Sequence, residues 1–224
     1  MKTQTIVLSG AFALATALSL SLWAQEGKPG SGPEVTPTQK EMPRRGAGPA
    51  AAATKGDLFE VDPVHTTVIF KIQHMGVSNF YGRFDDASGS VSLDAADPAN
   101  DTFNIQVKAD SLDTNNKKRD SDVTSPSFFN VAEFPTISFK STKTAKAGAN
   151  SYNVTGDLNF HGITKSITVS LVLTGPKQTQ MGNRTGFETT FTIKRTDYGM
   201  DTYVANGGLS DEVQITISGE AVKK

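Results

Sequence analysis

Strict alternation of apolar and polar residues is the feature that most limits how this chain can fold. Beyond residue 57 the alternation recurs many times, as in Phe103–Lys108, where every second residue is apolar. Successive side chains of a strand point to opposite faces of a sheet, so this period gives each strand one apolar and one polar face. The pattern predicts strands at residues 68–74, 90–93, 103–109, 137–139, 152–160, 167–173, 187–193 and 213–217.

These segments favour an all-β fold with antiparallel neighbours, because no regular strand–helix alternation recurs. Eight such strands can close into a barrel that is either filled by its own side chains or wide enough for one slender ligand. A filled barrel would serve only as an interaction module, and both alternatives fit the pattern. Residues 115–131 break the alternation and predict one or two short helices, with Pro126 near a helix start and Phe128 and Phe129 plugging one end of the barrel.

The first 55 residues differ in composition from the rest of the chain. Residues 1–24 combine Lys2, an apolar run from residue 6 and a cleavage position after Ala24, which predicts a signal peptide. An uncleaved anchor is the alternative, because the run is close to the minimum length that spans a bilayer. Residues 25–55 are rich in proline, glycine and alanine and predict a disordered linker. The folded domain is therefore expected at residues 56–224.

Composition removes several classes of function. The chain has no cysteine, which excludes disulfides and thiolate sites, and its formal net charge of -1 gives no indication of a nucleic-acid partner. No nucleophile elbow, phosphate-binding glycine loop or dinucleotide fingerprint is present in the sequence. We therefore predict no cofactor.

The three histidines do not have the spacing of a metal site. His65 and His74 are nine residues apart and would face opposite sides of a continuous strand. His161 is out of phase with the apolar row that ends at Phe160, although Gly162 could introduce a bulge there. A three-histidine metal site needs all three side chains to converge, so we predict no metal.

His74 is the first candidate polar site residue. It continues the inward apolar row of Phe70 and Ile72, and it would lie where the interior meets the rim. It is there either as a hydrogen-bonded structural residue or as a ligand contact. The alternative function is a hydrolase or isomerase that acts on an apolar substrate in the cavity. It would need His74 beside a carboxylate such as Asp120 or Asp197, but no motif places a nucleophile next to a base.

Two arginines are the other candidates. Arg195 is in phase with the inward row of the strand that precedes it, so its charge would need a partner in the interior. Asp197 and Asp211 are the nearest acidic residues for a buried ion pair, and an anion-binding arginine at the cavity mouth is the alternative. Arg119 could bind a phosphate, or it could pair with a neighbouring aspartate in the "NNKKRDSD" charge run.

Several motifs in a fixed order resemble those of the YceI-like family, the bacterial polyisoprenoid-binding proteins. They are "DPVHTTVIFKIQHMGVSNFYGRF", "SLDT", "RD", "SFFNVAEFPTISFKST", "VTGDLNFHGITK", "GF" at 186–187, "RTDYGM" and "LSDEV". The resemblance covers essentially all of residues 57–222. Family members often have a histidine and a leucine where this chain has Asp122 and Val123, and aspartates where it has Ser127 and Asn130.

The resemblance implies an eight-stranded antiparallel, lipocalin-like barrel with a long apolar cavity. It also implies a periplasmic or secreted bacterial carrier of an isoprenoid quinone or polyprenyl phosphate, often a homodimer, with only transient membrane contact unless the signal is uncleaved. We predict a non-enzymatic protein. The candidate ligand-binding residues are Phe70, Ile72, His74, Phe103, Ile105, Val107, Arg119, Phe139, Val154, Leu158, Val169, Leu171, Phe191, Arg195 and Ile215.

Overall fold

The computed structural model describes residues 56–224, and the strands of this part form one antiparallel sheet. The predicted signal peptide (1–24) and linker (25–55) lie outside the described residues. Between residues 56 and 224, no helix is long and apolar enough to cross a bilayer. The strands are β1 (Asp57–Val61), β2 (Thr67–His74), β3 (Ser78–Phe84), β4 (Ala87–Leu93), β5 (Thr102–Lys108), β6 (Leu112–Asp113), β7 (Thr136–Lys146), β8 (Ser151–Phe160), β9 (Ile163–Thr179), β10 (Gly182–Lys194) and β11 (Leu209–Lys223).

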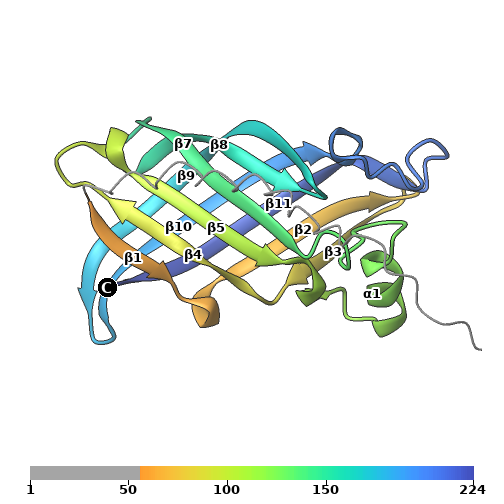
Figure 1. Ribbon diagram of the computed structural model, residues 1–224, viewed down its shortest axis with the longest axis horizontal. Coiled ribbons are helices and arrows are strands. Elements are labelled where there is room, and N and C mark those ends of the chain that lie inside the picture. The colour runs from red at the N-terminus through yellow and green to blue at the C-terminus, as the bar shows by residue number, and fades with distance from the viewer. Residues whose placement is uncertain (1–55) are drawn as a thin grey trace, which may run out of the picture. The chain divides into compact units, whose positions relative to one another are not determined.

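The sheet closes into a barrel of eight strand paths (Figure 1). Two of these paths are each interrupted once, so each of the two consists of two successive strands. β1 and β2 form one path, broken by the 3-10 helix η1 (Pro63–His65), and β3 and β4 form the next, broken at Asp85 and Asp86. β11 pairs with β10 on one side and with both β1 and β2 on the other, which completes the ring. The prediction of an eight-stranded antiparallel barrel is confirmed, and each predicted strand overlaps one of the eight paths.

Two tight hairpin turns lie at one end of this barrel. In the β2–β3 turn Met75 and Gly76 have φ of 54° and 68°, and in the β8–β9 turn His161 and Gly162 have φ of 50° and 74°. Two successive residues with positive φ are typical of the type I′ turn, whose twist matches that of the flanking strands. His161 is therefore a turn residue, and no bulge brings it into the row that ends at Phe160.

The single α-helix of the described chain, α1 (Lys117–Thr124), lies at this end too (Figure 1). Its N-terminus is capped by the side chain of Asn116, which accepts a hydrogen bond from the backbone N–H of Arg119 at 3.1 Å. The helix ends before Pro126, so the prediction that this proline lies near a helix start is wrong. A proline restricts the residue before it to extended conformations, and it therefore ends the helix here.

The segment after α1 turns back over the barrel end. Phe129 makes edge-to-face contacts with Phe84 of β3 and Phe160 of β8, at ring-centroid distances of 5.5 and 5.6 Å. Phe129 thus packs into the barrel end as predicted, but Phe128 and Phe129 line the cavity and do not plug this end. Three short 3-10 helices complete the described part: η2 (Pro98–Asn100), η3 (Ala109–Ser111) and η4 (Arg195–Tyr198).

Candidate functional site

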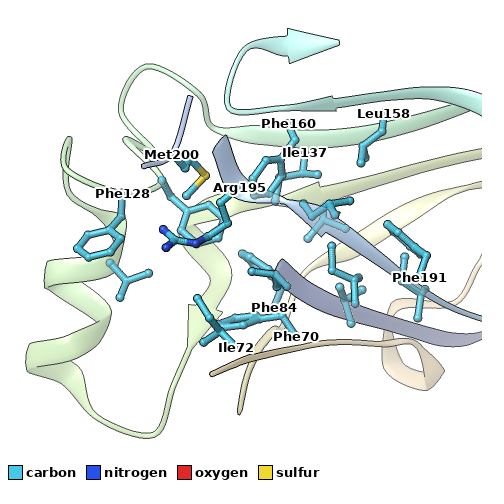
Figure 2. Close-up of a pocket in the computed structure, with 18 of the residues that line it drawn as sticks. Phe70, Ile72, Phe84, Phe128, Ile137, Leu158, Phe160, Phe191, Arg195 and Met200 are labelled. Carbon is cyan, nitrogen blue, oxygen red and sulfur yellow. The ribbon is translucent and has the colours of Figure 1, made fainter. Parts of the chain in front are cut away.

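The barrel is hollow over part of its length. Its interior holds a cavity of about 1000 Å³, which rejects the alternative of a completely filled barrel. β10 lines the cavity with the alternate residues Phe187, Thr189, Phe191 and Ile193, a path of about 20 Å at the usual rise per residue. Figure 2 shows side chains from several strands, Phe191 among them, directed into the same apolar space.

The two ends of the cavity differ. At the end that carries α1, exposed residues such as Met75, Ser78 and Tyr203 also line the cavity, so it opens to solvent there. Towards the other end the interior is filled, because Phe59 and Val91 are completely buried and neither lines the cavity. A ligand would therefore enter and leave past α1.

Every residue that the sequence nominated lines this cavity, although its role in ligand binding stays a prediction. Phe103, Ile105 and Val107 come from β5, and Val154 and Leu158 from β8; all of them are buried. The remaining nominated residues that line it are Phe70, Ile72, His74, Arg119, Phe139, Val169, Leu171, Phe191, Arg195 and Ile215.

Other cavity residues were not nominated. Some belong to the same alternating rows and carried a usable signal, namely Val68, Phe160, Phe187, Ile193, Val213 and Ile217. Others come from α1 and the loops around the mouth, where no periodicity indicates which side chains point inward; these include Val123, Phe128, Phe129, Met200 and Tyr203.

Arg195 is the charged group buried at the inner side of the mouth. Only 4% of its surface is exposed, and its guanidinium is directed to the side of the mouth on which Phe128 is drawn (Figure 2). It donates hydrogen bonds to the backbone carbonyls of Ser210, at 3.0 Å, and Thr202, at 3.3 Å. Burial lowers the pKa of Arg195, and more distant carboxylates partly offset this effect.

The predicted ion pair of Arg195 with Asp197 or Asp211 is wrong. Asp197 instead pairs with Lys165 at 3.0 Å. Asp211 accepts hydrogen bonds from the backbone N–H and the hydroxyl of Thr196, both at 2.9 Å, and these bonds help to lower its pKa against the opposing effect of burial. Arg195 thus faces the cavity as a cation with carbonyl partners and, within the described chain, without an ion pair.

Arg119 extends from α1 across the mouth. Its Nε and Nη2 donate to the hydroxyl and carbonyl oxygens of Thr114, at 2.9 and 2.7 Å, and its guanidinium stacks 4.1 Å above the ring of Phe80. It pairs with neither neighbouring aspartate, because Asp120 accepts hydrogen bonds from Thr114 and Asp122 pairs with Lys118. Of the two alternatives for Arg119, the local ion pair is therefore absent.

His74 lies exposed at the rim, where β2 ends. In the part of the chain that the structure describes, its imidazole makes no hydrogen bond or ion pair, so the expected structural hydrogen bond is missing there. The pairing with Asp120 or Asp197 that an enzyme would need is also not formed. His65 instead pairs with Asp62, and across residues 56–224 no three metal-binding side chains come together.

The comparisons with known proteins agree with this architecture. The family model of the YceI-like domain matches residues 59–221. A UPF0312 protein of Yersinia pestis (strain Pestoides F) is 38% identical over 180 residues, which cover 79% of this chain and 90% of that protein.

Two solved structures share the fold. The crystal structure of Burkholderia cenocepacia BcnA superposes with a TM-score of 0.66 at 26% identity and covers 72% of this chain and 99% of its own. A polyisoprenoid binding domain from Saccharophagus degradans superposes with a TM-score of 0.60 at 16% identity, with coverage of 76% and 100%. The family model extends over most of the barrel, and the Yersinia protein is related over nearly its whole length. This chain therefore belongs to the YceI-like family.

Proposed function

We propose that this protein is a non-enzymatic carrier of a long isoprenoid-type lipid, such as an isoprenoid quinone or a polyprenyl phosphate. The observation that carries the proposal is the apolar cavity of about 1000 Å³. It opens at the α1 end of the barrel, and side chains fill the barrel interior at the other end. A slender tail that enters tail-first would leave its head group at the mouth. The name of the Saccharophagus degradans domain, a polyisoprenoid binding domain of the same fold, supports this class of ligand.

Burial of the tail would supply most of the affinity. Each buried methylene contributes about 0.8 kcal/mol, so a tail of several isoprene units needs no polar contact to bind. An apolar wall discriminates poorly between tails of similar width, because one methylene more or less changes binding little. Selectivity would therefore lie in the head group, which would meet His74, Arg119 and Arg195 at the mouth.

The location and the assembly are part of the same proposal. The signal-like residues 1–24 favour a periplasmic or secreted carrier, and the linker 25–55 would let the barrel move away from a membrane or a partner. A homodimer is the assembly that the family resemblance suggests.

Extraction of the purified protein with organic solvent, followed by mass spectrometry, tests the proposal. We expect a prenyl lipid in the extract, or saturable uptake of an added isoprenoid quinone by the delipidated protein. An empty extract together with no uptake would refute the carrier. Ester hydrolysis that disappears in His74→Ala would favour an enzyme instead.

A further inference from the structure

Three exposed apolar side chains stand around the mouth of the cavity. Val77 and Met75, in the β2–β3 turn, are 86% and 65% exposed, and Tyr203, in the loop between η4 and β11, is 55% exposed. Met75 and Tyr203 also line the cavity, whereas Val77 does not. We call these three residues the rim tip. An apolar surface that continues out of a cavity marks the place where a partner meets the protein.

The rim tip is held in place by backbone hydrogen bonds. The N–H of Met75 donates to the carbonyl of Gly208 at 3.0 Å, which ties the β2–β3 turn to the neighbouring loop. Within that loop the N–H of Leu209 donates to the carbonyl of Tyr203, also at 3.0 Å, and the Tyr203 ring lies 6.0 Å from that of Phe128. Backbone hydrogen bonds therefore hold the two loops that carry these apolar side chains in a fixed arrangement.

The backbone conformation of Met75 and Tyr203 indicates that their side chains, and not the turn geometry, account for these two residue types. Met75 has φ of 54° and Tyr203 has φ of 62°, a left-handed region that glycine or asparagine would adopt at lower cost. Methionine and tyrosine at such positions give up backbone stability for the side chain. Tyrosine combines an apolar ring with a hydroxyl, and this combination suits the boundary between lipid and water.

We propose that the rim tip docks on the surface of a lipid bilayer, so that the cavity opens directly into the apolar layer. The inference rests on the proposed function, because a membrane lipid would then pass into the cavity without crossing water. Three side chains on two loops form too small a contact for a stable protein interface, which needs on the order of 1,000 Å². A deformable bilayer can accept such a narrow apolar wedge.

The charges beside the mouth indicate which surface suits the rim tip. α1 carries Lys117, Lys118 and Arg119 against Asp120 and Asp122, so its charges nearly cancel. Apolar insertion is then the main attraction, and binding to uncharged phosphatidylcholine vesicles should persist at high salt concentration, where attraction between opposite charges is screened.

A tryptophan placed at the rim tip tests the docking. The full chain contains one tryptophan, Trp23, so Trp23→Phe combined with Val77→Trp gives one reporter at the tip. The matched control combines Trp23→Phe with Val64→Trp. Val64 is also an exposed valine, at 83%, but it lies in η1, separated from the tip by the eight residues of β2. Phosphatidylcholine vesicles with bromine-labelled acyl chains should quench and blue-shift the emission at residue 77 and leave residue 64 unchanged.

A second variant connects docking to lipid transfer. Val77→Asp should slow uptake of quinone from vesicles about tenfold, because it places a charge where an apolar side chain enters lipid. It should leave uptake from detergent solution unchanged, since Val77 does not line the cavity. Val64→Asp, the matched control, should match the unaltered protein in both assays.

Each other outcome identifies what has failed. Equal quenching at residues 77 and 64, or none at either, would overturn docking through the rim tip. A concentration-dependent blue shift at residue 77 without vesicles would show that a second copy covers the tip, and this would also overturn it. If the unaltered protein takes up no quinone even from detergent, the carrier function fails, while the quenching result still decides the docking.

Discussion

Replacement of Asp101 by asparagine should stabilise the protein at neutral pH and have little effect near pH 4. Asp101 precedes β5, is only 6% exposed, and accepts a hydrogen bond from the backbone N–H of Asp94 at 2.7 Å. Burial raises the pKa of Asp101 to about 6, and the charges of Asp94 and Asp97 act in the same direction against that hydrogen bond. An asparagine oxygen can accept the same bond without carrying a charge.

The size and the sign follow from this pKa. The pKa of the Asp101 carboxyl rises from its ordinary value of 3.8 to about 6. One pKa unit corresponds to about 1.4 kcal/mol, so the ionised carboxylate lowers the free energy of unfolding by at most about 3 kcal/mol. The folded state holds the proton more tightly than the unfolded chain between pH 3.8 and 6, so stability falls as pH rises through this window. We expect about 1–2 kcal/mol in practice, because a loop can admit water when the carboxylate ionises.

Urea unfolding at intervals from pH 4 to pH 8 measures this effect. The difference in unfolding free energy between Asp101→Asn and the unaltered protein should grow from near zero at pH 4 to its full value above pH 6. Asp157→Asn, which removes an exposed carboxylate from the outer face of β8, is the control and should give no such rise. A difference for Asp101→Asn that is constant across this range would refute the reasoning.

Three further changes have clear directions. Gly82→Ala should lower both the melting temperature and the uptake of quinone, because a Cβ there would lie 2.3 Å from the Phe70 ring and force it towards the cavity; a variant with unchanged uptake would contradict this. Asp62→Asn should lower the melting temperature at pH 7, since the hydrogen bond from Arg184 holds the pKa of Asp62 well below its usual range. This stabilisation begins to be lost as pH falls below 3.8, so the difference in melting temperature between the variant and the unaltered protein should be smaller at pH 3 than at pH 7. Ile215→Phe should weaken quinone binding at least about tenfold in a titration by occupying cavity volume, with little change in urea unfolding because Ile215 is only partly buried; undiminished binding would place the tail elsewhere.

The barrel could be predicted from the sequence because nearly every strand alternates apolar and polar residues, but this alternation fails in β3. Its inward row is Phe80, Gly82 and Phe84, and the glycine interrupts the apolar pattern. The structure gives the reason: the space above Gly82 is occupied by the ring of Phe70 from β2. A side chain of β2 thus fills the inward position of Gly82 in β3, and the residues of β3 alone cannot indicate this.

The mouth was less predictable than the wall. The phase of Arg195 placed it correctly at the interior, but its partners are the carbonyls of Thr202 and Ser210. Every residue carries a carbonyl, so residue types give no indication of such a partner, whereas the two nearby aspartates wrongly suggested an ion pair. Met200 and Tyr203 reach the cavity from an irregular loop and had no periodic signal.

The division of the barrel into a filled and a hollow half predicts where a bound lipid should act. Phe59 and Val91 in the filled half are packed on all sides, whereas the side chains around the cavity pack against their neighbours in the wall and face empty volume on their inner side. A tail in the cavity would supply the missing packing contacts, and a ligand that binds only the folded state stabilises it. Amide hydrogen exchange with and without bound quinone should therefore slow in β2, β3 and α1 and change little in β1 and β4. Equal slowing in both halves would mean that the lipid stabilises the fold as a whole rather than through contacts in the cavity.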